Sequence, residues 1–386
     1  MTDIDMDDLL ENLAQCRRCG ICRNAVYQEM GFDGVCPVWR NSSGFETSFM
    51  RGRLQVAQAL LDGRLDKTAE NVESLYTCML CGNCTEICAA AFDPKKTLQQ
   101  IRQVLSDAPN ETRDLIVDKI LNHMNPYEED NTLKRNWVEE VGFDVPSNAS
   151  TIYYTGCTAG MRLPTIAIST AKILRAATVD FGVLEDEPCC GSVMIRTGKV
   201  EAAKTNAELL KNAIVDAGAE RIIVSCPGCF NTLTTDFPER FDIALPEVIH
   251  IVEYAAELIR NGDLKFRGQG ETRKVTYHDP CHFGRELGIY DAPREILQAI
   301  PGIELVEMES KREAALCCGS GGGVRSYDPD LSKRIGADRI RQALDTGAEV
   351  IATACPFCVS NLEGGARQEG SSIGVADIVD LIAERL

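Results

Sequence analysis

The sequence predicts an α + α/β protein, in which an N-terminal α-helical module precedes two repeated α/β subdomains built on parallel sheets. Two observations support this prediction. Strand-like runs alternate with amphipathic helices only after residue 150. One pattern of five cysteines also occurs twice in that part of the chain, with similar segments between the cysteines. We therefore expect domains at 1–110, 151–270 and 271–386, with a helical linker over 111–150.

The composition narrows the class of protein. Of 386 residues, 44% are hydrophobic and 25% are charged, which is ordinary for a globular protein, and no segment approaches the ~18 uncharged apolar residues of a membrane span. A net charge of -18 argues against nucleic acid as a partner, because phosphates attract basic surfaces. The acidic start is unlike a secretory or mitochondrial leader, so we expect a cytoplasmic protein. In that reducing compartment, eighteen cysteines indicate metal binding rather than a disulfide framework.

Eight of these cysteines lie in the N-terminal module. The runs CRRCGIC and CMLCGNC each place three thiols at three-residue intervals, and each run has a fourth, displaced cysteine. This spacing is typical of 4Fe-4S cubane clusters, in which the displaced cysteine ligates the other cluster. The predicted ligand sets are Cys16, Cys19, Cys22 and Cys88 for one cubane, and Cys78, Cys81, Cys84 and Cys36 for the other. Zinc is the alternative, but structural zinc sites usually join two separate CxxC pairs.

The residues around these runs have helical periodicity. Residues 48–63 carry apolar side chains at helical spacing and end on Gly63, and Thr68 is a candidate N-cap for a second helix over 68–78. Further helices are predicted over 97–107 and 112–124. The module is therefore expected to be mostly helical, and residues 143–150 are expected to form a linker.

The repeated pattern begins where a strand-like run meets a cysteine. Each half then has a CC pair followed by glycine, and later a CPxC pair preceded by a glycine-terminated helix and a β-branched strand. The two sets are Cys157, Cys189, Cys190, Cys226 and Cys229, and Cys281, Cys317, Cys318, Cys355 and Cys358. Each half is expected to end on a helix, over 249–259 and 375–386. The thiols are expected to converge in a crevice at the carboxyl ends of the strands. A zinc site in one half remains an alternative, although zinc takes four ligands and each half offers five thiols.

The duplicated pattern resembles the CCG domain found in the B-type component of heterodisulfide reductases, and the module in front resembles their C-type component. Fused in this order, they resemble heterodisulfide reductase D over about residues 10 to 386. The wider family includes iron-sulfur subunits of glycolate oxidase, lactate utilisation and anaerobic glycerol-3-phosphate dehydrogenase. The resemblance implies that each five-cysteine set binds a noncubane 4Fe-4S cluster and that the two clusters flank a substrate disulfide. It also implies a redox partner, either a flavoprotein or a membrane cytochrome b.

Candidate site residues follow from this resemblance. Cys189, Cys190, Cys317 and Cys318 are the candidate catalytic cysteines, and His278 and His282 are candidate proton donors. The candidate ligands for an anionic disulfide, such as the CoM-S-S-CoB heterodisulfide, are Arg196, Lys199, Arg285 and Arg325. The alternative for these histidines and arginines is hydrogen bonding to the cysteines and clusters. The GSGGG run at 319–323 lacks the spacing of a phosphate loop and is assigned to the neighbouring cluster.

The leading hypothesis is a disulfide (heterodisulfide) reductase-type oxidoreductase that works as part of a complex, on small-molecule disulfides and thiols. It is expected in the cytoplasm, peripheral to the membrane through its partner. One alternative is an electron-relay iron-sulfur protein within a flavin-dependent 2-hydroxy-acid or glycerol-3-phosphate dehydrogenase complex, and another is a zinc-containing scaffold. The sequence has no dinucleotide fingerprint, so a flavin or nicotinamide is expected on a partner.

Overall fold

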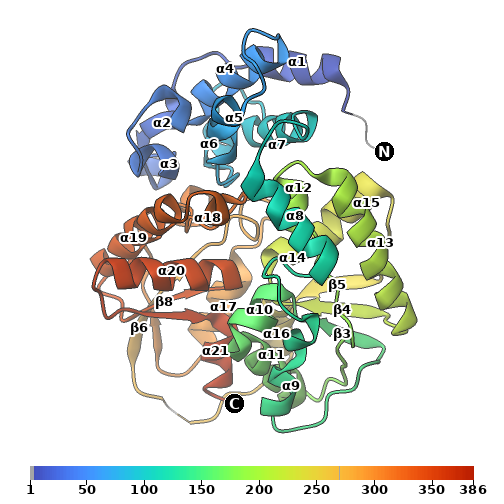
Figure 1. Ribbon diagram of the computed structural model, residues 1–386. Coiled ribbons are helices and arrows are strands. Elements are labelled where there is room, and N and C mark those ends of the chain that lie inside the picture. The colour runs from blue at the N-terminus through green and yellow to red at the C-terminus, as the bar shows by residue number, and fades with distance from the viewer. Residues whose placement is uncertain (1–3, 269) are drawn as a thin grey trace.

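The N-terminal module is almost entirely helical in the computed structural model, which describes residues 4–268 and 270–386 (Figure 1). Its α-helices are α1 (Met6–Ala14), α2 (Ile21–Asn24), α3 (Pro37–Arg40), α4 (Met50–Leu61), α5 (Ala69–Tyr76), α6 (Asn83–Glu86) and α7 (Pro94–Val104). Short 3-10 turns, η1 (Gln28–Met30) and η2 (Glu46–Ser48), and an antiparallel hairpin of β1 (Val26–Tyr27) and β2 (Phe32–Asp33) lie between them. The prediction of a mostly helical module is confirmed.

The helices of this module form where the apolar spacing predicted them. In α4 the residues Leu54, Ala57 and Leu60 are buried on one face, because positions three and four apart share a side of a helix. The Thr68 side chain accepts a hydrogen bond from the Asn71 amide at 3.3 Å, which confirms it as the N-cap of α5.

A helical segment connects the module to the first sheet. It contains α8 (Glu111–His123), the 3-10 turn η3 (Asn131–Arg135) and α9 (Trp137–Glu140). Trp137 is fully buried, and its ring lies edge-on to Tyr153 at 5.8 Å between centroids. The connecting segment is therefore part of the core of the first α/β half.

The first α/β half contains a parallel sheet of order β3-β4-β5. Its elements are β3 (Thr151–Tyr154), α10 (Cys157–Arg162), α11 (Pro164–Ala176), α12 (Ser192–Arg196), α13 (Val200–Asp216), β4 (Arg221–Val224), α14 (Pro227–Asn231), the π-helix η4 (Thr232–Asp236), α15 (Phe237–Phe241), β5 (Glu247–His250) and α16 (Ile251–Asn261). Alternating strands and helices on parallel strands confirm the predicted fold class for this half.

The second half repeats this plan with a parallel sheet of order β7-β6-β8-β9. Its elements are β6 (Arg273–His278), α17 (Asp291–Ala299), β7 (Ile303–Leu305), the 3-10 turn η5 (Arg312–Ala314), α18 (Val324–Tyr327), α19 (Pro329–Asp345), β8 (Val350–Thr353), α20 (Pro356–Gln368), β9 (Gly374–Asp377) and α21 (Ile378–Ala383). At the place that the edge strand β7 takes beside β6, the first half has a single parallel bridge between Gly182 and Ile152 of β3.

The predicted starts of the two terminal helices were wrong. Residues 249–250 and 375–377 belong to strands β5 and β9, and the helices begin directly after them. His250 and Asp377 end these strands, and their side chains accept hydrogen bonds from the amides of Val252 and Val379. Since one residue both ends the strand and caps the helix, no turn residue separates the two elements in the sequence.

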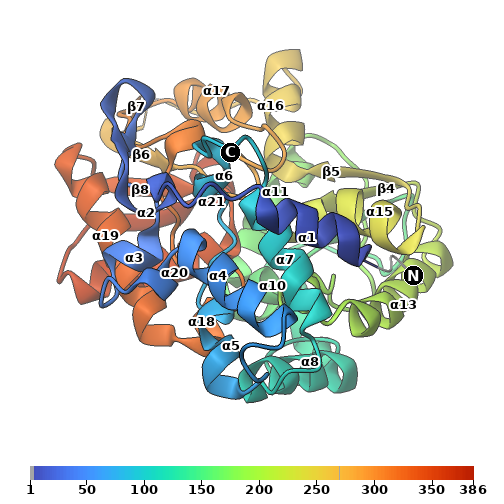
Figure 2. The same cartoon turned by 90° about the horizontal axis from the view of Figure 1, so that it is seen from above.

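The two halves share one hydrophobic core. The last helix of each half packs against the first long helix of the other, α21 against α11 and α16 against α17. Ser169 on α11 donates to the Asp380 carboxylate on α21 at 2.7 Å. The N-terminal module lies across both halves, since α3 contacts α19 and α7 contacts α12 (Figure 2).

Candidate metal centres and the cavity between them

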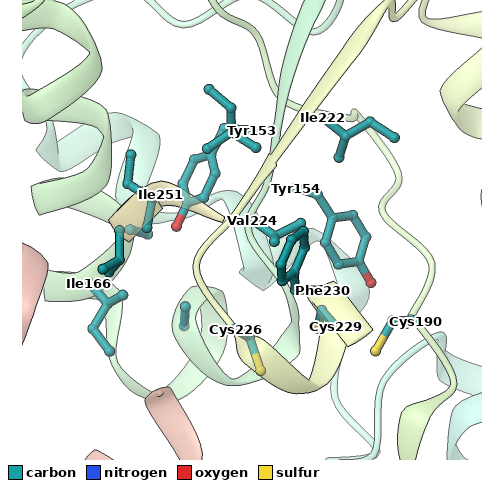
Figure 3. Close-up of a cluster of buried hydrophobic side chains, with 14 of the residues drawn as sticks. Tyr153, Tyr154, Ile166, Cys190, Ile222, Val224, Cys226, Cys229, Phe230 and Ile251 are labelled. Carbon is teal, nitrogen blue, oxygen red and sulfur yellow. The ribbon is translucent and has the colours of Figure 1, made fainter. Parts of the chain in front are cut away.

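The five thiols of the first half gather at the carboxyl ends of its strands. Cys157 begins α10 after β3, Cys226 follows β4 and Cys229 lies one turn later on α14. Figure 3 shows Cys190, Cys226 and Cys229 grouped beside Tyr154 and Phe230. All five thiols are buried, and all eighteen cysteines of the chain, each within the described residues, are free. This placement is the crevice that the strand pattern predicts.

The CC-Gly turns hold a backbone amide against sulfur in the same way in both halves. The Gly191 amide donates to Cys189 Sγ at 3.4 Å, and the Gly319 amide donates to Cys317 Sγ at 3.4 Å. Both glycines have positive φ, at 80° and 97°. A Cβ on Gly319 would lie 2.5 Å from the Ser332 carbonyl oxygen, so only glycine fits this turn.

The thiols of each half lie within hydrogen-bond reach of one another. The Cys189 and Cys229 thiols donate to Cys190 and lower its pKa to about 5. The Cys229 thiol of the same half, and then the Cys355 thiol of the other half, lower the pKa of Cys226 well below its usual value by the same interaction. The sulfur groups of the first and second halves therefore meet at Cys226 and Cys355.

A cavity of about 480 Å³ lies between the halves, and both sulfur groups line it. Its cysteines are Cys190, Cys226 and Cys229 from the first half, and Cys281, Cys318, Cys355 and Cys358 from the second. Apolar side chains, among them Tyr127, Leu163 and Phe357, line another part of the wall. The donor set of buried thiolates with amide hydrogens directed at sulfur fits iron-sulfur clusters, because these groups require soft sulfur ligands and hydrogen bonds to those sulfurs.

Of the candidate catalytic cysteines, Cys190 and Cys318 line this cavity and Cys189 and Cys317 do not. Of the six predicted histidines and basic side chains, Arg196, His282 and Arg325 line it. Arg196 is buried and pairs with Asp236 at 2.8 Å, whereas Arg325 is exposed. His282 pairs with Glu286 at 3.4 Å, and its Nδ1 lies 4.0 Å from Cys281 Sγ.

The other three of these six side chains, Lys199, Arg285 and His278, do not line the cavity. Lys199 is held by Asp114 at 2.9 Å. Arg285 donates to the carbonyl oxygens of Cys81, Glu313 and Ala315, so its charge is used between the N-terminal module and the second half. His278 is 1% exposed and lies behind the second sulfur group.

A partly buried ionic network, which was not predicted from the sequence, supports the cavity wall at His282. Glu286 accepts from Asn231 at 2.7 Å and pairs with Lys95 at 3.1 Å, so it joins all three regions of the chain. Burial alone would lower the pKa of His282, but the Glu286 carboxylate and Cys281 raise it to about 9. Burial would raise the pKa of Glu286, but His282 and Lys95 lower it to about 2. The i, i+4 spacing of His282 and Glu286 is the only local signal of this network in the sequence.

The N-terminal thiols lie close together within their module. Cys36 lines one small cavity together with Cys78, Cys81 and Cys84, and Cys22 from the other predicted set also lines it. Cys16, Cys22, Cys84 and Cys88 contact one hydrophobic cluster, formed mainly by α1, α4, α5 and α7. Cys19 is exposed. The assignment of each cysteine to a particular cluster remains a prediction.

The N-terminal thiol group that contains Cys78 and Cys81 directly adjoins the second half. The Cys317 thiol hydrogen-bonds to Cys81 and lowers the Cys81 pKa to about 7. In the GSGGG run, a Cβ on Gly321 would lie 2.6 Å from the Met79 carbonyl oxygen, and one on Gly322 would overlap that of Cys78. Glycines are thus required here because the run packs against the backbone of the N-terminal cysteine motif.

Comparisons with known proteins agree with this architecture. The family model of the 4Fe-4S dicluster domain matches residues 12–92, and that of the cysteine-rich CCG domain matches residues 151–234 and 275–363. A solved hypothetical protein from Helicobacter pylori has a similar fold, with a TM-score of 0.58 at 7% identity over 99% of this chain and 76% of that one.

Several curated proteins are similar in sequence. The D-type component of the dihydromethanophenazine:CoB--CoM heterodisulfide reductase from Methanosarcina barkeri is 34% identical over 98% of this chain and 95% of its own. The B-type component of a fumarate reductase (CoM/CoB) from Methanothermobacter marburgensis is 31% identical over 90% of this chain and 69% of its own. The probable iron-sulfur-binding oxidoreductase FadF from Bacillus subtilis is 31% identical over 81% of this chain and 46% of its own.

Proposed function

Because this chain belongs to the heterodisulfide reductase D family of iron-sulfur oxidoreductases, we propose that it reduces or forms a small-molecule disulfide in the cavity between its α/β halves. The observation that carries the proposal is the cavity itself, which thiols from both five-cysteine sets line. One small molecule in this cavity can therefore contact both sets. The names of two relatives include CoM and CoB, and CoM-S-S-CoB is the disulfide we propose first.

The proposed cofactors are two cubane 4Fe-4S clusters in the N-terminal module and two noncubane 4Fe-4S clusters on the five-cysteine sets. Such clusters supply or accept electrons singly when bound, and a disulfide needs two electrons and two protons to become two thiols. Two sites on one cavity therefore suit the reaction better than one site. The residues that would hold the noncubane clusters include Cys189 and Cys190 in the first half and Cys317 and Cys318 in the second.

Side chains of the cavity wall have proposed roles in binding and proton delivery. Arg325, exposed at the cavity, binds an anionic group of the disulfide. Arg196 adds positive charge at the wall, where Asp236 fixes its position. His282 holds a proton on its imidazole at neutral pH, because Glu286 keeps its pKa at about 9, and it delivers that proton to a product sulfur.

Electrons are exchanged with a redox partner, either a flavoprotein or a membrane cytochrome b. The relatives are named as subunits, and the exposed Cys19 brings the first N-terminal thiol set to the surface. Within the described residues no helix is long and apolar enough to cross a membrane. We propose a cytoplasmic protein that meets the membrane through its partner.

The competing function is electron relay, without disulfide chemistry, in a flavin-dependent dehydrogenase complex for 2-hydroxy acids or glycerol 3-phosphate. The similarity to FadF, an oxidoreductase whose name mentions no disulfide, keeps this second function open.

Anaerobic assays of the iron-loaded chain separate the two functions. With reduced viologen as donor, a disulfide reductase consumes CoM-S-S-CoB and releases both thiols, whereas a relay protein does not. Addition of either thiol to the oxidised protein should also produce a new paramagnetic signal. Iron and sulfide analysis should give about sixteen of each per chain, for four clusters. Absence of thiol release from a fully loaded protein would rule out the disulfide reaction.

A further inference from the structure

His278 and Tyr154 occupy equivalent positions in the two halves. His278 is the last residue of β6 and lies opposite Thr353 of β8, and Tyr154 is the last residue of β3 and lies opposite Val224 of β4. Each precedes the first cysteine of its half by three residues, and each is 1% exposed. The two positions differ in chemistry although the surrounding cysteine frame is the same.

The tyrosine does not offer its proton to sulfur. Its hydroxyl donates to the Pro188 carbonyl oxygen at 2.8 Å. Its pKa is raised well above the usual value by burial and then by the nearby Cys190 and Cys229 thiols, so the ring lies beside this pair (Figure 3). The first half therefore has an aromatic ring, but no tyrosine O–H donor, directed at these two sulfurs.

The histidine lies against the corresponding pair of sulfurs in the second half. One of its ring nitrogens, Cys318 Sγ and Cys358 Sγ all lie within 4.8 Å of one another. Burial excludes water from this ring, and among residues 4–268 and 270–386 its Nε2 has no hydrogen-bond partner that meets strict geometry. The pKa of Cys318 is held well below its usual value by the Cys317 and Cys358 thiols and also by His278.

Arg339 on α19 determines which nitrogen of His278 carries the proton. Its Nε donates to His278 Nδ1 at 3.1 Å, and a guanidinium has no acceptor, so Nδ1 must present a lone pair. Burial lowers the pKa of Arg339 to about 10, so it remains a donor at neutral pH. With its lone pair on Nδ1, the imidazole carries its proton on Nε2, which leaves Nε2 available to the sulfurs. The equivalent position in the first half, also sixteen residues before the CPxC motif, is the buried Leu210.

We propose that Arg339 fixes His278 as an Nε2–H donor to the sulfurs of Cys318 and Cys358, and that this donor makes the second metal site easier to reduce than the first. A hydrogen bond to a ligating thiolate withdraws negative charge from the metal and so raises its reduction potential. His278 is then a positioning and tuning residue, and not a proton donor to substrate. The proposal rests on the proposed function only in requiring a redox cluster at each five-cysteine set.

The test measures reduction potentials of the iron-loaded full chain by EPR-monitored redox titration. His278→Phe should shift the potential of one five-cysteine site to a more negative value and leave the other three sites unchanged. Arg339→Met should shift the same site in the same direction by a smaller amount, and His278→Gln, which keeps an N–H donor, should recover part of the difference. Tyr154→Phe is the matched control in the first half and should shift nothing.

Each contrary result overturns the inference. Unchanged potentials in both His278→Phe and Arg339→Met would show that the imidazole does not act on the site. Loss of about four iron atoms in His278→Phe, with normal folding by circular dichroism, would show that His278 is a metal ligand instead. The titration needs no disulfide, so a missing potential shift and a missing disulfide reductase activity are separate outcomes.

Discussion

The two α/β halves share a parallel-sheet plan and a five-cysteine frame, but within the described residues a thiol contact with the N-terminal module is found in the second half. Cys317 contacts Cys81, and Arg285 donates to the Cys81 carbonyl oxygen. In the first half, Cys226 contacts Cys355, a thiol of the second half. The repeat therefore determines the ligand frame, whereas contacts outside the repeat distinguish what each half does.

The same contrast holds for the charged residues that follow the CC pairs. Arg196 in the first half is buried and neutralised by Asp236, and Arg325 in the second half is exposed at the cavity. His282 has a partly buried carboxylate partner, Glu286, and the first half has Thr158 at the corresponding place after its first cysteine. The cavity is thus built from two similar frames with unlike walls, which suits a substrate with two different ends.

Replacing one CC cysteine in each half should have the largest effect and tests whether both halves are needed. Cys190→Ser and Cys318→Ser should each lose disulfide reductase activity and about four iron atoms per chain, because each removes a proposed ligand from one cluster. Iron analysis and EPR of the two variants should show intact cubane signals. A relay protein should instead keep electron transfer from viologen to an artificial acceptor in the first-half variant, because the contact between Cys81 and Cys317 lies in the second half.

The next largest effect is expected at Arg102, which ties the module to both halves. Its fully buried guanidinium donates to the carbonyl oxygens of Leu75 and Cys78 within the module, and of Arg196 and Gly322 outside it. Arg102→Met leaves these acceptors unpaired and should lower the free energy of unfolding by ~3 kcal/mol or more. Denaturant unfolding followed by tryptophan fluorescence and by cluster absorbance should show the module separating first.

Arg53→Met is the matched control for Arg102. Arg53 is also buried, but it donates to Ser74 and Thr77 inside the module only. It should destabilise the module without uncoupling it from the halves. If the module unfolded separately from the halves to the same extent in both variants, Arg102 would have no special role in joining them.

Much of this architecture could be predicted because cysteine spacing and strand-helix alternation are local properties of the sequence. Parallel strands bring their carboxyl ends to one edge, so the convergence of the thiols follows once the strands are recognised. The directions of long side chains could not be predicted in this way. Lys199 and Arg285 follow cysteine motifs, but partners far along the chain, Asp114 and the Cys81 carbonyl oxygen, hold them away from the cavity.

The network around Glu286 was missed for the same reason. Its partners Lys95 and Asn231 come from the module and from the first half, so only the folded chain brings the three together. The strands β5 and β9 were missed for a local reason, because each passes into a helix without a turn residue.

Glu286→Gln should change the pH dependence of turnover by an intermediate amount. The Glu286 carboxylate is the main influence that raises the pKa of His282 to about 9, and burial opposes it. Without the carboxylate, the high-pH limb of kcat, which reports loss of the His282 proton, should move from near pH 9 to about 6.5 or below. Glu363→Gln, at another part of the cavity wall, should leave the limb in place.

The same shift has a consequence for stability with a defined sign. A histidine whose pKa is higher in the folded state stabilises the fold below its unfolded value of about 6.5, and this contribution is lost as the pH rises through about 9. Glu286→Gln should therefore reduce the difference in stability between pH 6 and pH 9. An unchanged limb together with an unchanged stability profile would show that Glu286 does not control His282.

The smallest effect is expected at Arg325, where the contrast with Arg196 is sharpest. Arg325 is exposed, so water and salt screen its attraction for an anionic group, and Arg325→Gln should raise KM about 2- to 5-fold without changing kcat. The KM of the natural chain should rise with ionic strength, and that of the variant should rise less. Arg196→Gln should behave differently, because it leaves the buried Asp236 without this partner and lowers stability as well as activity. If Arg325→Gln changed kcat and left KM unaltered, Arg325 would act on the reaction and not on the binding of the anionic group. The proposed role of Arg325 in substrate binding would then be wrong.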